Sequence, residues 1–260
     1  VLLDKYSFQA NNLEKMSVAT ENELYKFDFQ KNTYILKCFK VSGNYRSSRI
    51  KEHTEYEAEF VSSIENTILT AKVIKNSTGG RVVFINDVPA VLYSYETGKL
   101  FKYPDPVFPI QEASRVIAKL HLLQFEKPLK LSKTFSFDDV FNIWEPEFYR
   151  FMNESSNDGE LSHDFAKLKK IYKEIKKSYK KISQNTSIPW LHNHGDVTPR
   201  NFLIHNQEAI LIDFQNAFYG PRLLDVIDGA YEFSFGGKPP GINDFSRFDE
   251  FIEAYQKESA

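Results

Sequence analysis

The stretch HNHGDVTPRNFLIHNQEAILIDF, residues 192–214, combines three histidines with aspartates, asparagines and two short apolar runs. The two runs, 202–204 and 209–212, flank the polar tetrapeptide HNQE at 205–208, which is typical of a turn. The pattern therefore predicts a β-hairpin folded about Gln207. A hairpin of this kind brings together the polar residues that lie just outside its two strands.

The predicted register places Asn201 directly opposite Asp213. Facing residues have Cβ atoms about 4.5–5.5 Å apart, which lets two side-chain oxygens share one cation. An amide oxygen and a carboxylate are hard ligands, and they suit Mg²⁺ better than zinc. Asp196 lies shortly before this pair, on a loop that Gly195 and Pro199 would shape. Its carboxylate can accept a hydrogen bond from a substrate hydroxyl and take the proton.

A phosphoryl-transfer site also needs a lysine for the phosphates, and the first part of the chain offers one. Residues 23–41 predict two strands joined by a turn at 30–32, and Lys37 lies in the second strand. Residues 51–65 predict a helix with a buried stripe at every fourth position: Tyr56, Phe60 and Ile64. Glu57 lies beside that stripe and is the natural partner for Lys37, although three other glutamates are close by: Glu52, Glu55 and Glu59.

The rest of the chain divides into a strand-rich part and a helix-rich part. Two more strands, 81–85 and 90–96, follow turns at 76–80 and 86–89. After a proline-rich connector at 103–109, the periodicity predicts helices at 112–125, 137–153, 161–183, 221–235 and 244–258. The helix 161–183 carries an apolar stripe opposite a lysine-rich face: Leu168, Ile171, Ile175, Tyr179 and Ile182.

The composition of the 260-residue chain is that of an ordinary globular protein. Charged residues make up 26% with a formal net charge of −2, so no overall basic field exists to hold nucleic acid or an anionic membrane. No apolar run approaches the roughly 20 residues of a membrane span. The single cysteine, Cys38, cannot form an internal disulfide, and the first residues lack a signal-peptide pattern. We therefore expect a cytoplasmic protein with no nucleic-acid or membrane partner.

His194-Gly195-Asp196, followed at a fixed spacing by Asn201 and then by Ile212-Asp213-Phe214, resembles the aminoglycoside phosphotransferase and choline kinase family, which has the protein-kinase-like fold. The resemblance covers nearly the whole chain. The segment YILKCF is similar to the lysine strand of the family, and YEAEFVSSI is similar to its glutamate helix. The segment AVLYSYETG is similar to the hinge between lobes, and VIAKLH to the helix that follows.

The resemblance implies a role for each matching residue of the catalytic region. Asp196 would be the catalytic base that orients the substrate hydroxyl. Asn201 and Asp213 would be the Mg²⁺ ligands. Asp225, in the segment GPRLLDV, matches a further aspartate that the family carries after its metal aspartate, and we expect it mainly to cap or brace the catalytic loop.

The resemblance also implies the nucleotide contacts. Lys37, held by Glu57, would contact the phosphates of ATP or GTP. Backbone groups of the hinge would hydrogen-bond the base: Ser94, Tyr95 and Glu96. Asp228 and Glu232 share the helix 221–235 with Asp225. The three acids would either attract a cationic substrate, as in aminoglycoside or choline kinases, or form a solvated face.

Two features depart from the family pattern. Protein kinases cover the phosphates with a glycine-rich loop, but the corresponding segment MSVATEN, residues 16–22, has no glycine. We therefore expect looser or differently shaped phosphate contacts there. The sequence ends at FIEAYQKESA, residues 251–260, where family members usually continue into helices that complete the substrate pocket. The resemblance thus predicts a C-terminal truncation.

Other interpretations of the residues are less favoured. The spacing of His192, His194 and His205 matches no familiar zinc pattern, and we expect His194 to hold the Asp196 loop by hydrogen bonds. A Ser–His–Asp hydrolase would need a G-x-S-x-G elbow, which the sequence lacks. The turn NSTGG, residues 76–80, lacks the Lys-Ser/Thr of a Walker motif. The lysine-rich helix could bind nucleic acid or an acidic partner, but a solvated face is favoured.

The sequence thus predicts an α+β, two-lobed, protein-kinase-like fold. An N-terminal lobe with an antiparallel sheet and one main helix would span 1–93 and bind the nucleotide. Residues 94–98 would form the hinge, and 99–260 a mainly helical C-terminal lobe with the catalytic and substrate-binding groups.

The predicted function is a Mg²⁺-dependent kinase that transfers the γ-phosphoryl of ATP or GTP to the hydroxyl of a small, possibly cationic molecule. An aminoglycoside, homoserine, choline and another amino alcohol all stay open as acceptors, and a role in antibiotic resistance goes with the first. The alternatives are a homoserine- or choline-type metabolic kinase and a nucleotide-binding pseudokinase. Neither the preferred nucleotide nor the oligomeric state follows from the sequence.

Overall fold

The computed structural model describes residues 3–6, 11–16, 22–39, 50–100, 109–125, 129, 134–154, 162–235 and 244–260. Most of the glycine-free segment 16–22 and of the connector 103–109 lies outside these residues. Within the described parts of the chain, no helix combines the length and the apolar character that crossing a membrane requires.

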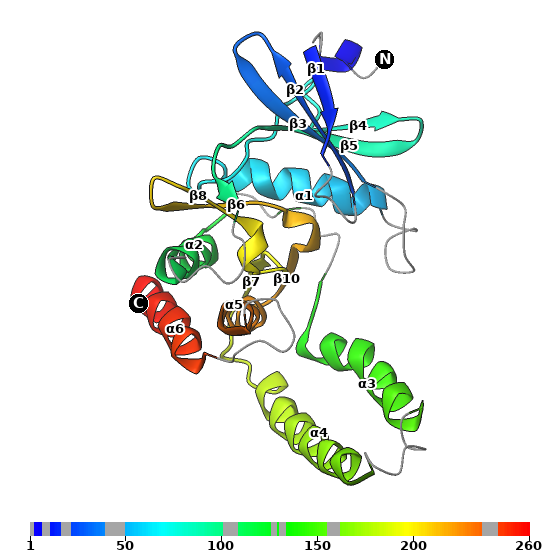
Figure 1. The fold of residues 1–260 in the computed structure, drawn as a ribbon, viewed down its shortest axis with the longest axis vertical. Helices are drawn as coiled ribbons and strands as arrows, with labels where there is room; N and C mark the ends of the chain where they lie inside the picture. The colour runs from blue at the N-terminus through cyan, green and yellow to red at the C-terminus, as the bar shows by residue number, and fades with distance from the viewer. Residues whose placement is uncertain are drawn as a thin grey trace.

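The N-terminal part forms a five-stranded antiparallel sheet with one long helix along it (Figure 1). In spatial order the strands are β1 (Asn11–Lys15), β2 (Glu23–Phe29), β3 (Asn32–Cys38), β5 (Val88–Ser94) and β4 (Val82–Ile85). The helix α1 (Ile50–Ile64) packs against β5 and β4. The predicted antiparallel sheet with one main helix is therefore confirmed.

The alternation of side chains along the strands gives this sheet two apolar faces. Leu36 and Leu92 belong to a cluster away from α1, whereas Val91 and Tyr93 belong to the large cluster that includes α1. Lys37 pairs with Val91 in the ladder between β3 and β5, so its side chain points to the α1 face. A lysine on the buried side of a sheet requires partners, because an unpaired buried charge is strongly unfavourable.

The remainder of the chain is mainly helical (Figure 1). The helices α2 (Ile110–Leu122), α5 (Leu223–Phe235) and α6 (Phe245–Ser259) pack together, and their buried residues continue the cluster that includes α1. Two small sheets lie between these helices and the N-terminal sheet. One consists of β7 (Trp190–Asn193) and β10 (Phe218–Pro221), and the other of β6 (Lys99–Leu100), β8 (Phe202–His205) and β9 (Glu208–Leu211).

Two helices, α3 (Phe137–Glu154) and α4 (Ser162–Ser183), form a pair that projects from the body, and we call it the α3–α4 arm (Figure 1). Aromatic rings join them: Phe148 stacks on Tyr172 with ring centroids 4.2 Å apart. Four residues of the apolar stripe on α4 are nevertheless 40%, 41%, 52% and 38% exposed: Leu168, Ile171, Ile175 and Ile182. The helix exists as predicted, but most of its stripe is not covered by the described residues.

The predicted helices after residue 109 all occur, and their ends differ from the prediction by three residues at most. The turn predicted at 86–89 is shorter than expected. Asn86 and Asp87 alone reverse the chain, with φ of 48° and 65°, and β5 begins at Val88. Two consecutive left-handed residues give the tight turn that matches the twist of the strands, and Asn and Asp tolerate that conformation.

The hairpin of β8 and β9 has a different register from the predicted one. Its turn consists of Asn206 and Gln207, with φ of 49° and 70°, so His205 faces Glu208. The prediction folded the chain about Gln207 alone and was wrong by one position. The physical reason is that two residues, and not one, form the turn. A change of one residue in the turn shifts the pairing along the whole hairpin.

This shift changes the relation between the two predicted metal ligands. Asn201 does not face Asp213 in the ladder; its backbone carbonyl instead accepts a hydrogen bond from the N–H of Ile212 at 2.9 Å. Asp213 lies beyond β9, at the start of the short helix η4 (Phe214–Asn216). Its position therefore depends on the local backbone and not on strand pairing.

Candidate active site

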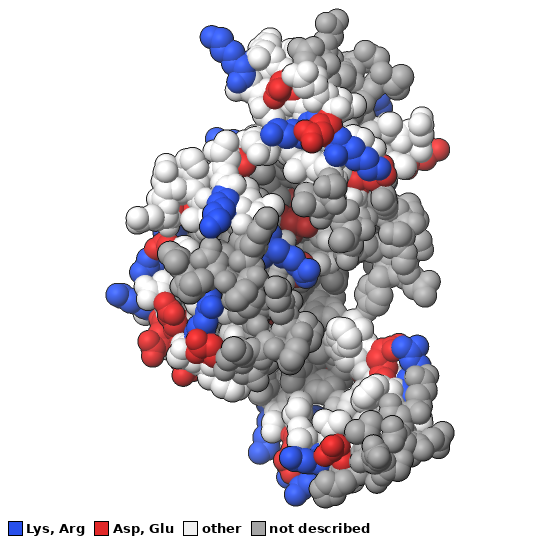
Figure 2. Space-filling view, in the orientation of Figure 1, with Lys and Arg blue, Asp and Glu red and all other residues white. Residues whose placement is uncertain are grey.

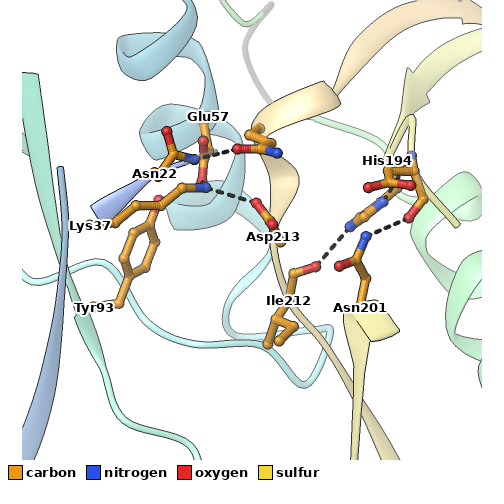
Figure 3. Close-up of polar contacts among 10 residues, drawn as sticks. Asn22, Lys37, Glu57, Tyr93, His194, Asn201, Ile212 and Asp213 are labelled. Atoms are coloured by element: carbon orange, nitrogen blue, oxygen red, sulfur yellow. Dashed lines mark hydrogen bonds and ion pairs between the residues drawn. The ribbon is translucent and has the colours of Figure 1, made fainter. Parts of the chain in front are cut away.

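Lys37 is held between two carboxylates that come from distant parts of the chain (Figure 3). Its Nζ lies 2.9 Å from Oε1 of Glu57 and 2.8 Å from Oδ1 of Asp213. Burial alone would lower the pKa of Lys37, but the attraction of Asp213 and Glu57 outweighs it and raises the pKa. Two of the three N–H bonds of the ammonium are used by these carboxylates, so one donor can serve a further anion.

Glu57 has a second partner that the sequence did not indicate. The hydroxyl of Tyr93 donates to the same oxygen of Glu57 that binds Lys37, at 2.9 Å. Burial raises the pKa of Glu57, while Lys37 and the Tyr93 hydroxyl oppose that shift. Tyr93 lies on the α1 face of β5, where a hydroxyl must find a partner. The sequence feature that could have indicated this contact is a tyrosine on the inward face of a buried strand.

Asp213 reaches Lys37 because its backbone is left-handed, with φ of 65°. Burial would raise its pKa, but Lys37 overcomes this effect and lowers it. Two residues further on, Gln215 accepts a hydrogen bond from the side chain of Asn22, just before β2 (Figure 3). The segment after β9 thus makes two contacts with the N-terminal part of the chain, one with Lys37 in β3 and one with Asn22 just before β2. No local sequence pattern could indicate the contact between Asn22 and Gln215, because the two residues are 193 positions apart.

The loop that carries Asp196 depends on one glycine. Gly195 has φ of 82°, and a Cβ there would lie 2.1 Å from the carbonyl oxygen of Asn216. Asp225, which is buried at the start of α5, accepts the N–H of His194 at 2.6 Å and the N–H of Gly195 at 2.8 Å. These contacts fit the expected bracing of the loop by Asp225.

The imidazole of His194 links this loop to the end of β9. Its Nδ1 accepts the N–H of Asp196 at 3.3 Å, so the proton lies on Nε2, which donates to the carbonyl of Ile212 at 3.0 Å. His194 therefore holds the loop by hydrogen bonds, as the sequence predicted.

Asn201 lies on the other side of Asp213 from Lys37. Figure 3 shows Asn201 and His194 on one side, with Lys37, Glu57 and Tyr93 opposite. The amide nitrogen of Asn201 donates to the backbone carbonyl of Asp196 at 2.8 Å. This bond fixes the orientation of the amide and leaves its oxygen as a ligand atom.

Asp228 is half-buried, which does not fit a fully solvated acidic face. It accepts the N–H of Val197 at 3.0 Å. Burial, reinforced by Asp225, Asp196 and Glu232, raises the pKa of Asp228 to about 7. The pKa of Glu232 is raised as well, first by burial. The two acids therefore lie in an electronegative region beside Asp196.

In the predicted hinge, two backbone donors are used within the protein. The N–H of Ser94 donates to the carbonyl of Lys72 at 2.8 Å, and the N–H of Tyr95 donates to the carbonyl of Thr33 at 3.1 Å. The hydroxyl of Ser94 donates to Glu96 at 2.7 Å. The backbone N–H groups of Ser94 and Tyr95 are therefore already used. For the predicted contact with the nucleotide base, this segment can offer the N–H of Glu96 and carbonyl oxygens.

Two of the three histidines of the opening stretch make hydrogen bonds within the protein. His192 is paired with Tyr56, and His194 with Ile212. No group of three or more His, Cys, Asp or Glu side chains in the described part of the chain is arranged to hold a metal ion.

A buried histidine outside that stretch was missed. His121, at the end of α2, lies 3.2 Å from Oδ2 of Asp225 through Nε2, and 2.8 Å from the hydroxyl of Tyr255 through Nδ1. The contacts that hold the Asp196 loop thus extend to α2 and α6. A histidine within the apolar pattern of 112–125 was the signal that could have found it.

Comparison with known proteins bears on the family and the fold of the chain. A family model described as "Phosphotransferase enzyme family" matches residues 21–258. No match is found among curated protein sequences.

Solved structures with the kinase-like fold superpose on nearly the whole chain. A microcompartment-associated aminopropanol kinase gives a TM-score of 0.67 at 16% identity, covering 98% of this chain and 78% of its own. An amicoumacin kinase in complex with AMP-PNP and Ca²⁺ gives 0.64 at 18%, covering 100% and 76%. A spectinomycin phosphotransferase in complex with ADP and its antibiotic gives 0.60 at 14%, covering 98% and 77%. The predicted fold class is confirmed.

Proposed function

The chain belongs to the phosphotransferase enzyme family, and from this premise we propose that it is a kinase for a small molecule. It transfers the γ-phosphoryl group of ATP or GTP to a hydroxyl group of that molecule. The observation that carries the proposal is the convergence on Lys37, from β3, of Glu57 from α1 and Asp213 from the segment after β9. Asn201 lies on the other side of Asp213, and its amide nitrogen donates to the backbone carbonyl of Asp196.

The two parts of the fold have different functions in this proposal. Residues 1–93 bind the nucleotide, 94–98 form the hinge, and 99–260 supply the catalytic and acceptor-binding groups. The third donor of Lys37 binds a phosphate oxygen, and Glu57 keeps the ammonium in place. The N–H of Glu96 and the carbonyls near it bind the base.

Asn201 and Asp213 fit a magnesium ion. Their donor atoms are an amide oxygen and a carboxylate oxygen, which are ligands that Mg²⁺ prefers. Because the amide nitrogen of Asn201 donates to the carbonyl of Asp196, the amide oxygen is the atom left to bind the ion. Mg²⁺ bound there supplies positive charge that neutralises the phosphate oxygens during transfer. The amicoumacin kinase structure, which contains AMP-PNP and Ca²⁺, supports a nucleotide with a divalent cation in this fold.

The chemical step falls to Asp196. Its carboxylate accepts a hydrogen bond from the acceptor hydroxyl, orients that oxygen in line with the γ-phosphorus, and takes its proton as the new P–O bond forms and the bond to the nucleoside diphosphate breaks. Asp225 and His194 keep the Asp196 loop in place through backbone contacts. The protein contributes position and charge, with no covalent intermediate.

The acceptor is a hydroxyl compound that carries a cationic nitrogen, either an ammonium or a quaternary ammonium group. Asp228 and Glu232 lie beside Asp196; burial is the first cause of the raised pKa of each acid, and the repulsion of nearby carboxylates, Asp196 among them, adds to it. An ammonium group of the acceptor placed there would relieve the repulsion among these carboxylates. Aminoglycosides, choline, homoserine and other amino alcohols meet this description.

The decisive test is Asp196→Ala with Asp249→Ala, an exposed acid on α6, as the matched control. We expect Asp196→Ala to reduce turnover by about 10²–10⁴-fold or more and to leave nucleotide affinity largely intact. Turnover is measured as Mg²⁺-ATP and Mg²⁺-GTP consumption with amino alcohols, aminoglycosides and amino acids as acceptors. Normal turnover in Asp196→Ala would refute the assignment of the base.

The same assay distinguishes the alternative classes. Nucleotide binding by the unaltered protein without any turnover would favour a pseudokinase, for which the glycine-free segment 16–22 is the supporting feature. On the face shown in Figure 2, the basic and acidic side chains of the described residues are interspersed and form no single basic patch. A nucleic-acid binder would instead show binding to unrelated nucleic acids that weakens steeply with salt.

A further inference from the structure

A buried hydrogen bond connects the nucleotide-binding part of the site to the strand that leads into the catalytic loop. The hydroxyl of Tyr56, on α1, lies 2.7 Å from Nδ1 of His192, on β7. The two residues are 136 positions apart, and they are 2% and 9% exposed. Neither belongs to the groups that bind nucleotide or perform the chemistry proposed above.

Both partners are neutral. Burial lowers the pKa of His192 to about 4 and is the main cause of the raised pKa of Tyr56. A neutral pair is not screened by salt and needs no counter-ion. Removing one partner leaves the other buried and unsatisfied, which is the more unfavourable part of losing a hydrogen bond.

Aromatic rings surround the pair and restrict how it can move. The imidazole of His192 contacts Phe60 of α1 at 5.4 Å between ring centroids and Phe125 at 4.7 Å. Phe60 in turn meets Phe214, the residue after Asp213, edge to face at 5.6 Å. The hydrogen bond thus lies at the polar centre of an apolar contact between α1 and the catalytic region, where it selects one orientation of the helix.

The location of the pair gives it a consequence for the site. Tyr56 immediately precedes Glu57 on the same helix, so a rotation or shift of α1 that breaks the bond to His192 also moves the carboxylate that holds Lys37. On the other side, His192 lies two residues before His194 and four before Asp196. One bond therefore relates the position of the phosphate-binding lysine to that of the catalytic loop.

We propose that Tyr56 and His192 are positioning residues that hold α1 in the orientation in which Glu57 aligns Lys37 with the catalytic loop. The proposal rests on the kinase function above for its activity readout. Its structural readout, the stability of α1 against local opening, does not depend on that function.

The test uses a double-mutant cycle of Tyr56→Phe and His192→Leu in the full chain. Each single change should raise the nucleotide KM about 5- to 30-fold, the range expected for the loss of one buried hydrogen bond, with a smaller change in kcat. The double variant should be no worse than the more affected single variant, because both changes remove the same bond. His192→Asn, which keeps an amide near the position of Nδ1, should recover part of the loss.

The control is Tyr179→Phe, the same substitution on the α3–α4 arm, which should leave KM unchanged. In the nucleotide-free protein, amide hydrogen exchange over Ile50–Ile64 should be faster in Tyr56→Phe than in the unaltered protein. Unchanged exchange together with unchanged KM would overturn the proposal, and so would additive losses in the cycle. If the unaltered protein fails to turn over nucleotide, the kinase function fails, and faster exchange in α1 would still support the positioning contact.

Discussion

The helix α1, which carries Glu57, and the arm helix α4 are both amphipathic, but the apolar residues of α1 are buried and most of those of α4 are exposed. In α1 the stripe residues Tyr56, Phe60 and Ile64 are 2%, 0% and 0% exposed, whereas Ile171 and Ile175 of α4 are 41% and 52% exposed. Both stripes follow the helical period equally well in the sequence. Periodicity therefore specifies a helix and its apolar side, but the rest of the chain decides whether that side becomes core.

The difference extends to polar groups. Around α1, buried polar side chains are joined across long sequence distances: Lys37 to Glu57 and Asp213, and Tyr56 to His192. On the arm, the ion pair of Lys176 with Glu145 is exposed, and such pairs contribute little. Substitutions near α1 should therefore affect both stability and function, while those at the exposed positions of the arm should affect neither strongly.

The largest effect is expected from Lys37→Met. It leaves the carboxylate of Glu57, whose side chain is 3% exposed, without its cation, and breaking a buried pair in this way costs about 3–5 kcal/mol of unfolding free energy. Adding Glu57→Gln should restore part of that stability, because one of the two carboxylates left without Lys37 is then neutral while Asp213 stays unpaired, and turnover stays lost. Urea unfolding and nucleotide consumption measure the two quantities separately. Recovery of turnover in the double variant would contradict the role given to Lys37.

A smaller, pH-dependent effect is expected from Asp228→Asn. The pKa of Asp228 is raised to about 7 in the folded protein, against an ordinary value near 3.9, so between these values the folded state binds the extra proton. Stability contributed by the protonated form is therefore lost as pH rises through this window. Removing the charge should stabilise the protein at pH 8 by roughly 1–3 kcal/mol, after allowance for partial exposure, and by less at pH 5.

The amide oxygen that Asp228→Asn introduces can still accept the N–H of Val197, so the loop contact survives. Urea unfolding at the two pH values measures the effect on stability. In the enzyme assay, the KM for a cationic acceptor should rise because one carboxylate is gone, while the KM for nucleotide should not. Equal stabilisation at pH 5 and pH 8 would show that the change does not act through the charge of Asp228.

The elements themselves could be predicted because they depend on local patterns. The strand that carries Lys37 and the helix that carries Glu57 follow from periods of two and of three to four residues. The register of β8 and β9 could not, since Asn206 and Gln207 both adopt positive φ without a glycine to signal it. Asp213 consequently reaches Lys37 through its left-handed backbone and not by facing Asn201.

The roles of the site residues came from resemblance to a family, and the contacts that support them needed the structure. Tyr93 with Glu57, Asn22 with Gln215 and His121 with Asp225 join residues 36, 193 and 104 positions apart. No local pattern relates residues so distant. The sequence gives a weaker indication of such contacts. Periodicity places polar side chains such as Tyr93 and His121 on buried faces, and a buried polar group must find a hydrogen-bond partner.

The smallest effect is expected from Ile175→Ala on the arm, and it sharpens the comparison when paired with Ile64→Ala on α1. Ile64 is fully buried, so its truncation leaves a cavity and costs about 2–5 kcal/mol. Ile175 is 52% exposed, and the apolar area that it loses is offset in part by the higher helix propensity of alanine, so the change should stay within about 0.5 kcal/mol. Urea unfolding of the two variants measures this difference directly. A loss at Ile175 as large as that at Ile64 would mean that the stripe on α4 is buried in solution, and that the arm is built like α1 after all.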